Sequence, residues 1–470
     1  MCFRDILRIG VSATIEGLAC EGALDEMKTK RKKLLILLPG GQRHKLKFWP
    51  LETSFREAPL TGTMLAALVP PELPVDVTVV DGSVSRIPLQ DTFDMVAISL
   101  ITGMALKGYE LAAHYRRSGA IVVLGGIHVT LLPEEARKHA DTIVLGYAER
   151  TWPRLLRDWM DGRLEAEYRS SGPAELEGLP HPRRDLQKPL GYMMPRTVNA
   201  TRGCRQACDF CVAPAVPMIW GTRPVGEVVE EIKTLPGRTF CFHDLNLTDD
   251  VDYARELFTA LRPLKRKWGG LASTRITGDP ELLDLMASSG CSYLLLGFET
   301  IQPAALRGVR KSFNTVHPYR DVVDALHERN IAVQGCFIFG LDDDTPDVFF
   351  RTVSAIEELR IDIPRFALYT PFPNTAAYRR LKAEDRILHE NWTYYDTQHV
   401  VIVPKHMSPE QLDRGFISAW RECFRITRSL RRVIFNKNHG INAVGNIAYS
   451  LYARQIINDT NRFPSSESLI

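Results

Sequence analysis

Short apolar segments alternate with helical segments along most of this chain, and no other feature constrains its fold as strongly. In the first third, helical stretches at 62–68 and 108–117 lie between such apolar runs. Alternation of this kind predicts parallel strands in a doubly wound sheet with helices on both faces. Ligands of such sheets bind beyond the carboxyl ends of the strands. The predicted strands are residues 33–38, 75–80, 95–100, 120–124 and 142–145.

The same alternation resumes in the middle of the chain, where six further strands are predicted with helices between them. Pro280 and Pro346 stand at the first position of two of these helices, where proline is favoured. A second α/β unit is therefore predicted, and in αβ barrels the chemistry gathers at the carboxyl ends of the strands. The predicted strands are residues 197–200, 238–243, 270–274, 292–298, 332–339 and 365–369.

A chain of 470 residues is too long for a single ordinary core. We therefore predict a division into separate α/β units and a helical end. The predicted parts are an N-terminal extension (1–29), a doubly wound Rossmann-like domain (30–165), a linker (166–194), a barrel-like domain (195–375) and a mainly helical C-terminal region (376–470).

Composition narrows the classes of function. A formal net charge of +3 leaves no electrostatic footprint for nucleic acid, so no nucleic-acid partner is expected. No run of about 18 or more apolar residues occurs, so no transmembrane helix is expected. The nine cysteines do not form a disulfide framework, which indicates a reducing compartment and predicts a cytoplasmic protein.

Cys204, Cys208 and Cys211 form the most specific motif in the sequence. Their C-x3-C-x2-C spacing, in one loop after a predicted strand, lets three thiolates reach three irons of a [4Fe-4S] cluster. The fourth iron would then be free to bind the amino and carboxylate groups of a small ligand, with Phe210 as an apolar wall. The alternative is a zinc site, which needs a fourth protein ligand. The nearest candidates for that ligand are His181, Cys241 and His243, none at the close spacing of a zinc finger.

This cysteine motif is typical of the radical S-adenosylmethionine (SAM) superfamily, and residues 195–375 resemble its catalytic core. The resemblance implies a partial (β/α)6 barrel, a [4Fe-4S] cluster, bound SAM and an electron donor such as flavodoxin or ferredoxin. It also implies SAM contacts in a fixed order at the strand ends. Taken singly, each charged residue among them could instead end its strand in a salt bridge. The implied contacts are Phe210, Asp244, Asn246, Arg275, Glu299, Gly335 and Phe337.

Glu299 has the most defined role among these contacts. A carboxylate at the end of the fourth strand can accept hydrogen bonds from both ribose hydroxyls of SAM. Gly297 precedes it and is expected to leave room for the ligand. Arg275 is expected to pair with the SAM carboxylate through its planar fork.

Polar and glycine residues also follow the strands of the first domain. Paired glycines at 125–126 let a backbone approach a bulky ligand, although a tight turn alone would explain them. Together with the segments at 133–136 and 146–149 they resemble the cobalamin-binding domain that precedes many radical SAM cores. The cobalamin contacts implied by this resemblance are Ser99, Thr102, Gly125, Gly126, His128, Gly146 and Glu149.

No histidine is expected below the cobalt. Cobalamin-dependent mutases and methionine synthases carry an Asp-x-His-x-x-Gly motif for that ligand, and it is missing after the first strand. His44 lies in the corresponding loop, but no glycine follows it three residues later. His128 is interpreted as a loop residue near the corrin rather than a metal ligand.

The resemblance continues beyond the barrel, to about residue 433. Residues 370–375 are similar to a Pro-x-Pro-Gly-Thr turn with Asn374 in place of glycine, and asparagine tolerates the left-handed conformation. Cys423 is the only cysteine after this turn, which excludes an auxiliary cluster. The first domain also lacks a cluster-forming cysteine set, which argues against a methylthiotransferase. Buried structural thiols are expected at Cys241, Cys291 and Cys336.

The segment 414–432 is basic and amphipathic. It could lie on an anionic membrane surface as a peripheral contact. The alternative is a helix that packs on the barrel with a solvated face.

Taken together, the resemblance implies that SAM is cleaved to a 5′-deoxyadenosyl radical, which abstracts hydrogen from an unactivated carbon of a small-molecule or lipid substrate. Cobalamin-dependent C-methylation is the leading prediction. Oxidative cyclisation, as in the anaerobic protoporphyrin ester cyclases, and other rearrangements share the same motifs. A cobalamin-binding sensor or carrier without catalysis is the alternative from another class, against which the intact cysteine triad argues. Hopanoid-type lipids, tetrapyrroles and peptides all remain possible substrates.

Overall fold

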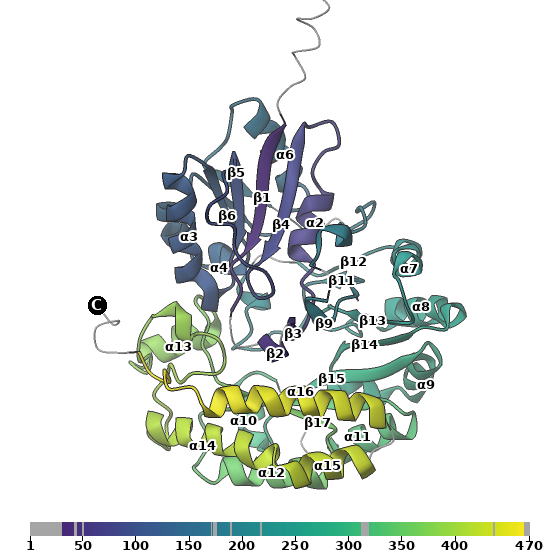
Figure 1. The fold of residues 1–470 in the computed structure, drawn as a ribbon. Coiled ribbons are helices and arrows are strands. Elements are labelled where there is room, and N and C mark those ends of the chain that lie inside the picture. The colour runs from purple at the N-terminus through teal and green to yellow at the C-terminus, as the bar shows by residue number, and fades with distance from the viewer. Residues whose placement is uncertain are drawn as a thin grey trace, which may run out of the picture.

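The computed structural model describes residues 31–464, apart from 42–44, 49–50, 171, 173–175, 189, 217–218, 312–318 and 436–437. Two six-stranded parallel sheets dominate it, one formed by the first third of the chain and one by the middle (Figure 1). The α/β class predicted for both parts is therefore confirmed. The predicted extension (1–29) and His44 lie outside the described residues.

The first sheet has the strand order β4-β1-β5-β6-β7-β8, and all of its pairs are parallel. The five predicted strands are present, and the short β8 at the edge was not predicted. The order reverses direction at β1, which is where a doubly wound sheet opens a crevice for ligands. The strands are β1 (Lys32–Leu38), β4 (Val75–Asp81), β5 (Met95–Ser99), β6 (Ile121–Gly125), β7 (Thr142–Leu145) and β8 (Glu167–Arg169).

Helices cover both faces of this sheet, because residues along each strand point alternately to opposite sides. Leu35 and Leu37 of β1 pack in the core that contains α3 (Ala105–Arg117). Leu34 and Ile36 pack in the core that contains α2 (Thr61–Ala67) and α6 (Thr151–Met160). All four leucine and isoleucine side chains are fully buried.

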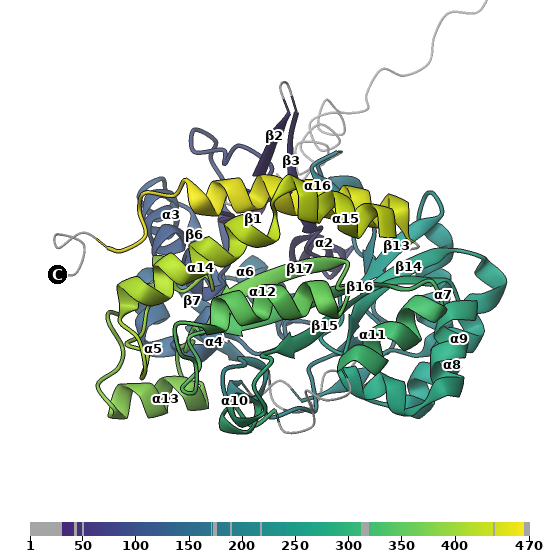
Figure 2. The ribbon, with the colours of Figure 1, turned by 90° about the horizontal axis from the view of Figure 1, so that it is seen from below.

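The second sheet has the order β10-β13-β14-β15-β16-β17, again entirely parallel, and curves around an inner face (Figure 2). Its strands are β10 (Thr197–Val198), β13 (Thr239–Phe242), β14 (Lys267–Ala272), β15 (Cys291–Glu299), β16 (Ala332–Phe339) and β17 (Ile363–Leu368). The helices on its outer side are α7 (Val225–Thr234), α8 (Val251–Leu261), α9 (Pro280–Ser288), α11 (Tyr319–Glu328) and α12 (Val348–Glu358). This arrangement is the open six-stranded barrel that was predicted.

A small three-stranded sheet joins the two units, in the order β2-β3-β9. It consists of the hairpin β2 (Lys45–Phe48) and β3 (Leu51–Glu57), inserted after β1, and of β9 (Tyr192–Met194) from the linker. Neither the hairpin nor β9 was predicted. The hairpin brings residues of the first domain to the barrel.

The C-terminal region is mainly helical, as predicted, and consists of α13 (Ala376–Ala383), α14 (Pro409–Cys423), α15 (Ile426–Phe435) and α16 (His439–Ile457). The basic segment 414–432 is divided between α14 and α15. Asn374 takes a φ of 59°, which confirms the left-handed turn expected there. Within the described part of the chain, none of the helices has the length and apolar character needed to cross a membrane.

The C-terminal region also completes the core of the first domain. Trp392 and Tyr395 belong to the same hydrophobic cluster as Val96 and Ile98 of β5. The Trp392 indole donates a hydrogen bond to Glu135 at 3.1 Å. The C-terminal region is therefore packed against the first domain and does not form a separate unit.

Candidate functional site

A cavity of about 270 Å³ opens at the carboxyl ends of β5, β6 and β7. Met64 and Leu65 of α2 and Trp152 of α6 form its apolar wall. Gly126 has a φ of 97°, and a Cβ there would lie 2.7 Å from the backbone nitrogen of Leu100. Only glycine fits this position, because a side chain would collide with the Leu100 backbone at the end of β5. Five predicted cobalamin contacts line the cavity, namely Ser99, Gly125, Gly126, Gly146 and Glu149.

The other two predicted contacts, Thr102 and His128, do not line this cavity. His128 lies in the short helix α4 (Ile127–Leu131) and is fully buried, so its interpretation as a loop residue is wrong. Its Nε2 lies 3.2 Å from both the Tyr109 hydroxyl and Glu135 Oε1. Because β6 runs directly into this helix, the histidine is carried into the core, where it ties α4 to its neighbours.

The three cysteines of the motif lie in the loop after β10. Cys208 is buried, whereas Cys204 and Cys211 are partly exposed, and none forms a disulfide. Burial raises the pKa of the Cys204 thiol to about 12 and that of Cys208 to about 11. The thiolate forms therefore need a positive charge to stabilise them, which iron would supply.

The three thiols do not converge on a point that a single ion could occupy. Among the described residues, no group of three or more His, Cys, Asp or Glu side chains could hold one metal ion. A zinc site requires such convergence. A [4Fe-4S] cluster does not, because each thiolate binds a different iron. The donor set thus fits the cluster better than it fits zinc.

Asp244 and Asn246 hold the cysteine loop in place. Asp244 is almost fully buried and accepts hydrogen bonds from the Ala200 amide at 3.0 Å and the Thr201 hydroxyl at 2.7 Å. Burial raises the pKa of Asp244 to about 6. Asn246 donates to Asp249 at 2.6 Å, and Asp249 accepts from the Arg205 amide at 2.9 Å. These contacts favour a positioning role for both residues.

Glu299 ends β15 next to a break in the pairing register with β16. Its carboxylate forms a buried ion pair with Lys311, whose ammonium group also donates to the Gly297 carbonyl at 3.0 Å. A Cβ at Gly297 would lie 2.2 Å from Glu299 Oε1. Gly297 therefore makes room for this ion pair, and not simply for a ligand as the sequence suggested.

Lys311 connects this pair to the cysteine loop. Its positive charge acts to lower the pKa of Cys208 and of Cys211, although burial dominates and raises both. The carboxylate of Glu299 acts in the opposite sense. Glu299, Lys311 and the thiols of Cys208 and Cys211 therefore form one electrostatic unit at the barrel mouth.

The remaining predicted SAM contacts are placed differently. Arg275 lies after β14 with an exposed side chain, and no hydrogen bond or ion pair of the described residues involves it. The Phe210 ring lies edge-on to Tyr369, with 6.4 Å between ring centroids. Phe337 points to the outer side of the barrel and stacks on Phe298 at 5.6 Å. Any contact from Gly335 or Phe337 to a ligand inside the barrel would thus come from the backbone.

Arg202 joins the two candidate sites. It immediately precedes Gly203 and Cys204, it lines the cavity of the first domain, and it forms an ion pair with Glu149 at 3.3 Å. Sequence reasoning missed this residue. Its position two residues before the motif was a signal, but its partner belongs to the other domain and could not be inferred.

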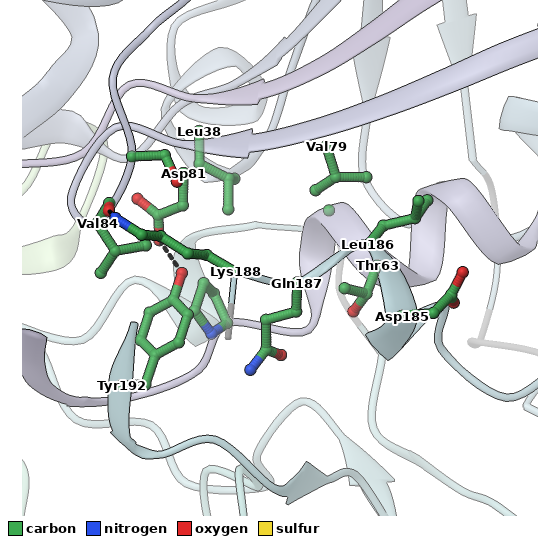
Figure 3. Close-up of a pocket in the computed structure, with 13 residues that line it drawn as sticks. Leu38, Thr63, Val79, Asp81, Val84, Asp185, Leu186, Gln187, Lys188 and Tyr192 are labelled. Carbon is green, nitrogen blue, oxygen red and sulfur yellow. Dashed lines mark hydrogen bonds between the residues drawn. The ribbon is translucent and has the colours of Figure 1, made fainter. Parts of the chain in front are cut away.

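A second cavity, of about 290 Å³, lies beside the ends of β1 and β4 (Figure 3). Several of its polar side chains are paired within the protein. The Tyr192 hydroxyl donates to Asp81 at 2.8 Å, and Lys188 donates to the Val84 carbonyl. No predicted site residue lines this cavity, and its contacts fasten the linker to the first domain.

Comparison with known families gives two matches. The B12 binding domain family matches residues 33–156, and the Radical SAM superfamily matches residues 198–356. The first range contains the residues that line the first cavity except Arg202, and the second contains the cysteine loop.

Two curated relatives come from Chlorobaculum tepidum. Bacteriochlorophyllide d C-12(1)-methyltransferase is 31% identical over 439 residues, which cover 90% of this chain and 93% of the relative. Bacteriochlorophyllide d C-8(2)-methyltransferase is 27% identical over 413 residues, covering 82% and 90%. Among solved structures, the radical S-adenosylmethionine methyltransferase TsrM from Kitasatospora setae aligns with a TM-score of 0.63 at 16% identity, over 90% of this chain and 98% of TsrM. That likeness concerns the fold alone.

Proposed function

Since this chain belongs to the cobalamin-dependent radical SAM family, we propose that it transfers a methyl group to an unactivated carbon of a small organic substrate. The observation that carries this proposal is the similarity to a C-methyltransferase over nearly the full length of both proteins. The position of the first cavity next to the cysteine loop also supports it. The cobalamin would be held on one side of the Arg202–Glu149 ion pair and the cluster on the other.

Cys204, Cys208 and Cys211 would hold the [4Fe-4S] cluster, and the cavity at Gly126 would hold part of the cobalamin. When bound, the cluster supplies the electron that cleaves SAM, and cobalamin supplies the methyl group. The protein's contribution is to fix the cysteine loop through Asp244.

We propose a tetrapyrrole as the substrate class. The support is that two relatives with high coverage are named for methylation of bacteriochlorophyllide d. Such a substrate is flat and apolar with polar edge groups. The aromatic side chains on the inner side of the barrel, described below, suit a ring system of this kind.

Anaerobic turnover with methyl-labelled SAM and bacteriochlorophyllide d tests this function. We expect the labelled methyl group in the tetrapyrrole and 5′-deoxyadenosine in the supernatant. Cys208→Ala is the matched control, which should form neither because the cluster would lose a thiolate ligand. Formation of 5′-deoxyadenosine with oxidation or ring closure, but no methyl transfer, would identify the cyclase or rearrangement alternative. Cobalamin binding without SAM cleavage would identify the sensor or carrier alternative.

We also infer that α15 rests on an anionic membrane surface. Arg432 anchors the helix to the barrel, since it is buried and pairs with Glu357 at 3.0 Å. The opposite side exposes Ile426, Leu430 and Ile434, which follow one another at helical spacing and are 71%, 53% and 61% exposed. Exposed arginines lie beside this apolar stripe at 425 and 431, and Arg421 near the end of α14 is exposed as well. An apolar stripe with basic borders suits a surface of acidic lipids.

A further inference from the structure

The inner face of the barrel carries polar and charged side chains that the proposed cofactor sites do not use. Along β16 and β17 the outward residues Phe337 and Phe366 are fully buried, whereas Cys336 and Arg365 on the inner side are partly exposed. The same alternation occurs on β15, where Tyr293, Leu295 and Gly297 are partly exposed and the intervening Leu294 and Leu296 are buried. Solvent therefore reaches the inner face of three adjacent strands.

Arg365 lies at the same level along the strands as Gly297, beside the predicted SAM contact Glu299. It is the register partner of Cys336, and Cys336 is the partner of Gly297, which contacts the Glu299–Lys311 pair. Adjacent strands are about 4.8 Å apart, so the Arg365 backbone lies about 10 Å from that of Gly297. A substrate beside SAM would thus come within reach of the Arg365 guanidinium.

A second guanidinium, Arg56, comes to the same place from the first domain. Phe55 packs against Tyr449 and Tyr452 of α16, with ring centroids 5.4 and 5.0 Å away. Tyr449 in turn accepts a hydrogen bond from Gln334 of β16 at 2.6 Å. The β3 strand is therefore fixed across the barrel, and the adjoining Arg56 side chain remains exposed there.

The two arginines affect each other electrostatically. The protein that surrounds Arg56 and the like charge of Arg365 lower the pKa of Arg56, although its side chain keeps access to solvent. Among the described residues, the carboxylate of Glu57 counteracts this effect, and burial lowers the pKa of the nearby His243, which favours its neutral form. Within the described part of the chain, no hydrogen bond or ion pair involves the side chain of Arg56, Glu57 or Arg365. The cluster has two positive charges and one negative charge, which leaves one positive charge uncompensated.

We infer that Arg56 and Arg365 bind a carboxylate of the substrate on the inner face of the barrel. A guanidinium fork matches a carboxylate in a planar, two-point contact. A single uncompensated charge fits a carboxylate better than a phosphate dianion. Tyr293 and Tyr449 would contact the flat body of the substrate beside this group. The inference deepens the proposed function and rests on it, since it assigns the acid group of a tetrapyrrole carboxylic acid.

The test compares bacteriochlorophyllide d with its methyl ester as binding probes for the reconstituted, SAM-loaded protein. The wild type should bind the ester about tenfold or more weakly than the acid, because a charge-assisted contact is lost. Arg56→Gln and Arg365→Gln should bind acid and ester alike. Arg365→Lys should recover part of the preference, because it keeps the charge without the fork. Arg117→Gln, on the exposed side of α3, is the matched control and should keep the full preference.

Cluster content and circular dichroism establish that each variant is folded. Equal binding of acid and ester by the wild type would overturn the inference, as would a variant that keeps the preference. A weakened affinity for SAM with an unchanged preference would also overturn it, by assigning Arg365 to the cofactor. Binding of neither probe would overturn both the substrate class and the carboxylate site. Intact acid preference without methyl transfer would contradict the proposed function alone.

Discussion

Glu299 adopts a backbone conformation that residues other than glycine rarely take, with a φ of 65°. Such a conformation costs on the order of 1–3 kcal/mol and is found mostly at functional sites. In this protein it aims the carboxylate at Lys311, inside the electrostatic unit that includes Cys208. The strained backbone therefore places one carboxylate and one ammonium group at the mouth of the barrel.

We predict that Glu299→Gln binds SAM about tenfold more weakly than the wild type, because an amide accepts hydrogen bonds from the ribose less strongly. Equilibrium dialysis of the reconstituted protein measures this affinity. Glu281→Gln, on the exposed side of α9, is the control and should change nothing. An unchanged affinity together with a lower melting temperature would mean that Glu299 serves only as the ion-pair partner of Lys311.

Asp344 is a second residue whose environment changes its pKa, and this change affects the pH dependence of stability. It is fully buried in the turn after β16, where it accepts hydrogen bonds from the amides of Gly340 and Leu341 at 2.9 and 3.0 Å. Burial raises the pKa of Asp344 to about 7. Between about pH 4 and pH 7 the folded state therefore binds more protons than the unfolded state, so stability falls as the pH rises through this window.

Asp344→Asn removes this titration while keeping a hydrogen-bond acceptor. The free energy of unfolding of the wild type should fall relative to that of the variant by up to about 4 kcal/mol between pH 4 and pH 7, at about 1.4 kcal/mol per pKa unit. Urea unfolding of the protein without cofactors across this range measures the difference. A constant difference between the two proteins would show that Asp344 is ionised throughout.

At the scale of the element, α15 bears on the two interpretations of the basic segment 414–432, as a membrane contact or as a helix packed on the barrel. The helix packs on the barrel through Arg432 and also exposes an apolar stripe on its other side, so the structure contains features of both. Neither could be chosen from the sequence, because helical periodicity shows that a stripe exists but not what covers it.

We predict that replacing Ile426, Leu430 and Ile434 together with serine reduces binding to vesicles of phosphatidylcholine and phosphatidylglycerol by more than about tenfold, because the buried apolar area is lost. Co-sedimentation measures the binding, and the wild type should not bind vesicles of phosphatidylcholine alone. Phe350→Ser is the control, since Phe350 is an exposed apolar residue on α12, 74% exposed, outside the stripe. Equal binding by the triple variant and the wild type would contradict the membrane assignment.

At the scale of the whole molecule, the C-terminal region and the first domain share one hydrophobic cluster. Trp392 connects them. Its ring packs edge-on against His128, with 5.8 Å between the ring centroids, and its indole nitrogen donates a hydrogen bond to Glu135. The same cluster contains Leu341 and Tyr369 of the barrel, so the barrel is also held against the first domain, where Arg202 pairs with Glu149.

Trp392→Ala should lower the free energy of unfolding by about 3–5 kcal/mol, the usual cost of truncating a buried tryptophan. It should also split thermal unfolding into two calorimetric transitions, because the shared core no longer couples the two domains. Trp159→Ala is the control, since Trp159 is equally buried but lies in a core within the first domain. A single transition at lower temperature in both variants would show that coupling does not depend on Trp392.

The sequence by itself determined the two sets of parallel strands and the cysteine loop. These features are local, since periodicity within one segment defines a strand and three thiols within a stretch of eight residues define a cluster motif. The glycines of the first cavity were predicted for the same reason, because each follows its own strand directly. The left-handed turn at Asn374 also depends only on its own residues.

Tertiary structure decided which side chains meet. Nothing local indicated that Gly297 accommodates the Glu299–Lys311 pair, or that His128 is buried against Glu135. The three barrel thiols were all expected to be buried. Cys241 and Cys291 are buried, whereas Cys336 is partly exposed on the inner face. The pairing of Arg202 with Glu149 and the approach of Arg56 to Arg365 join residues of different domains. Such contacts depend on how the sheets and the β2–β3 hairpin pack, and a pattern within one segment carries no information about the partner that another segment will bring to it.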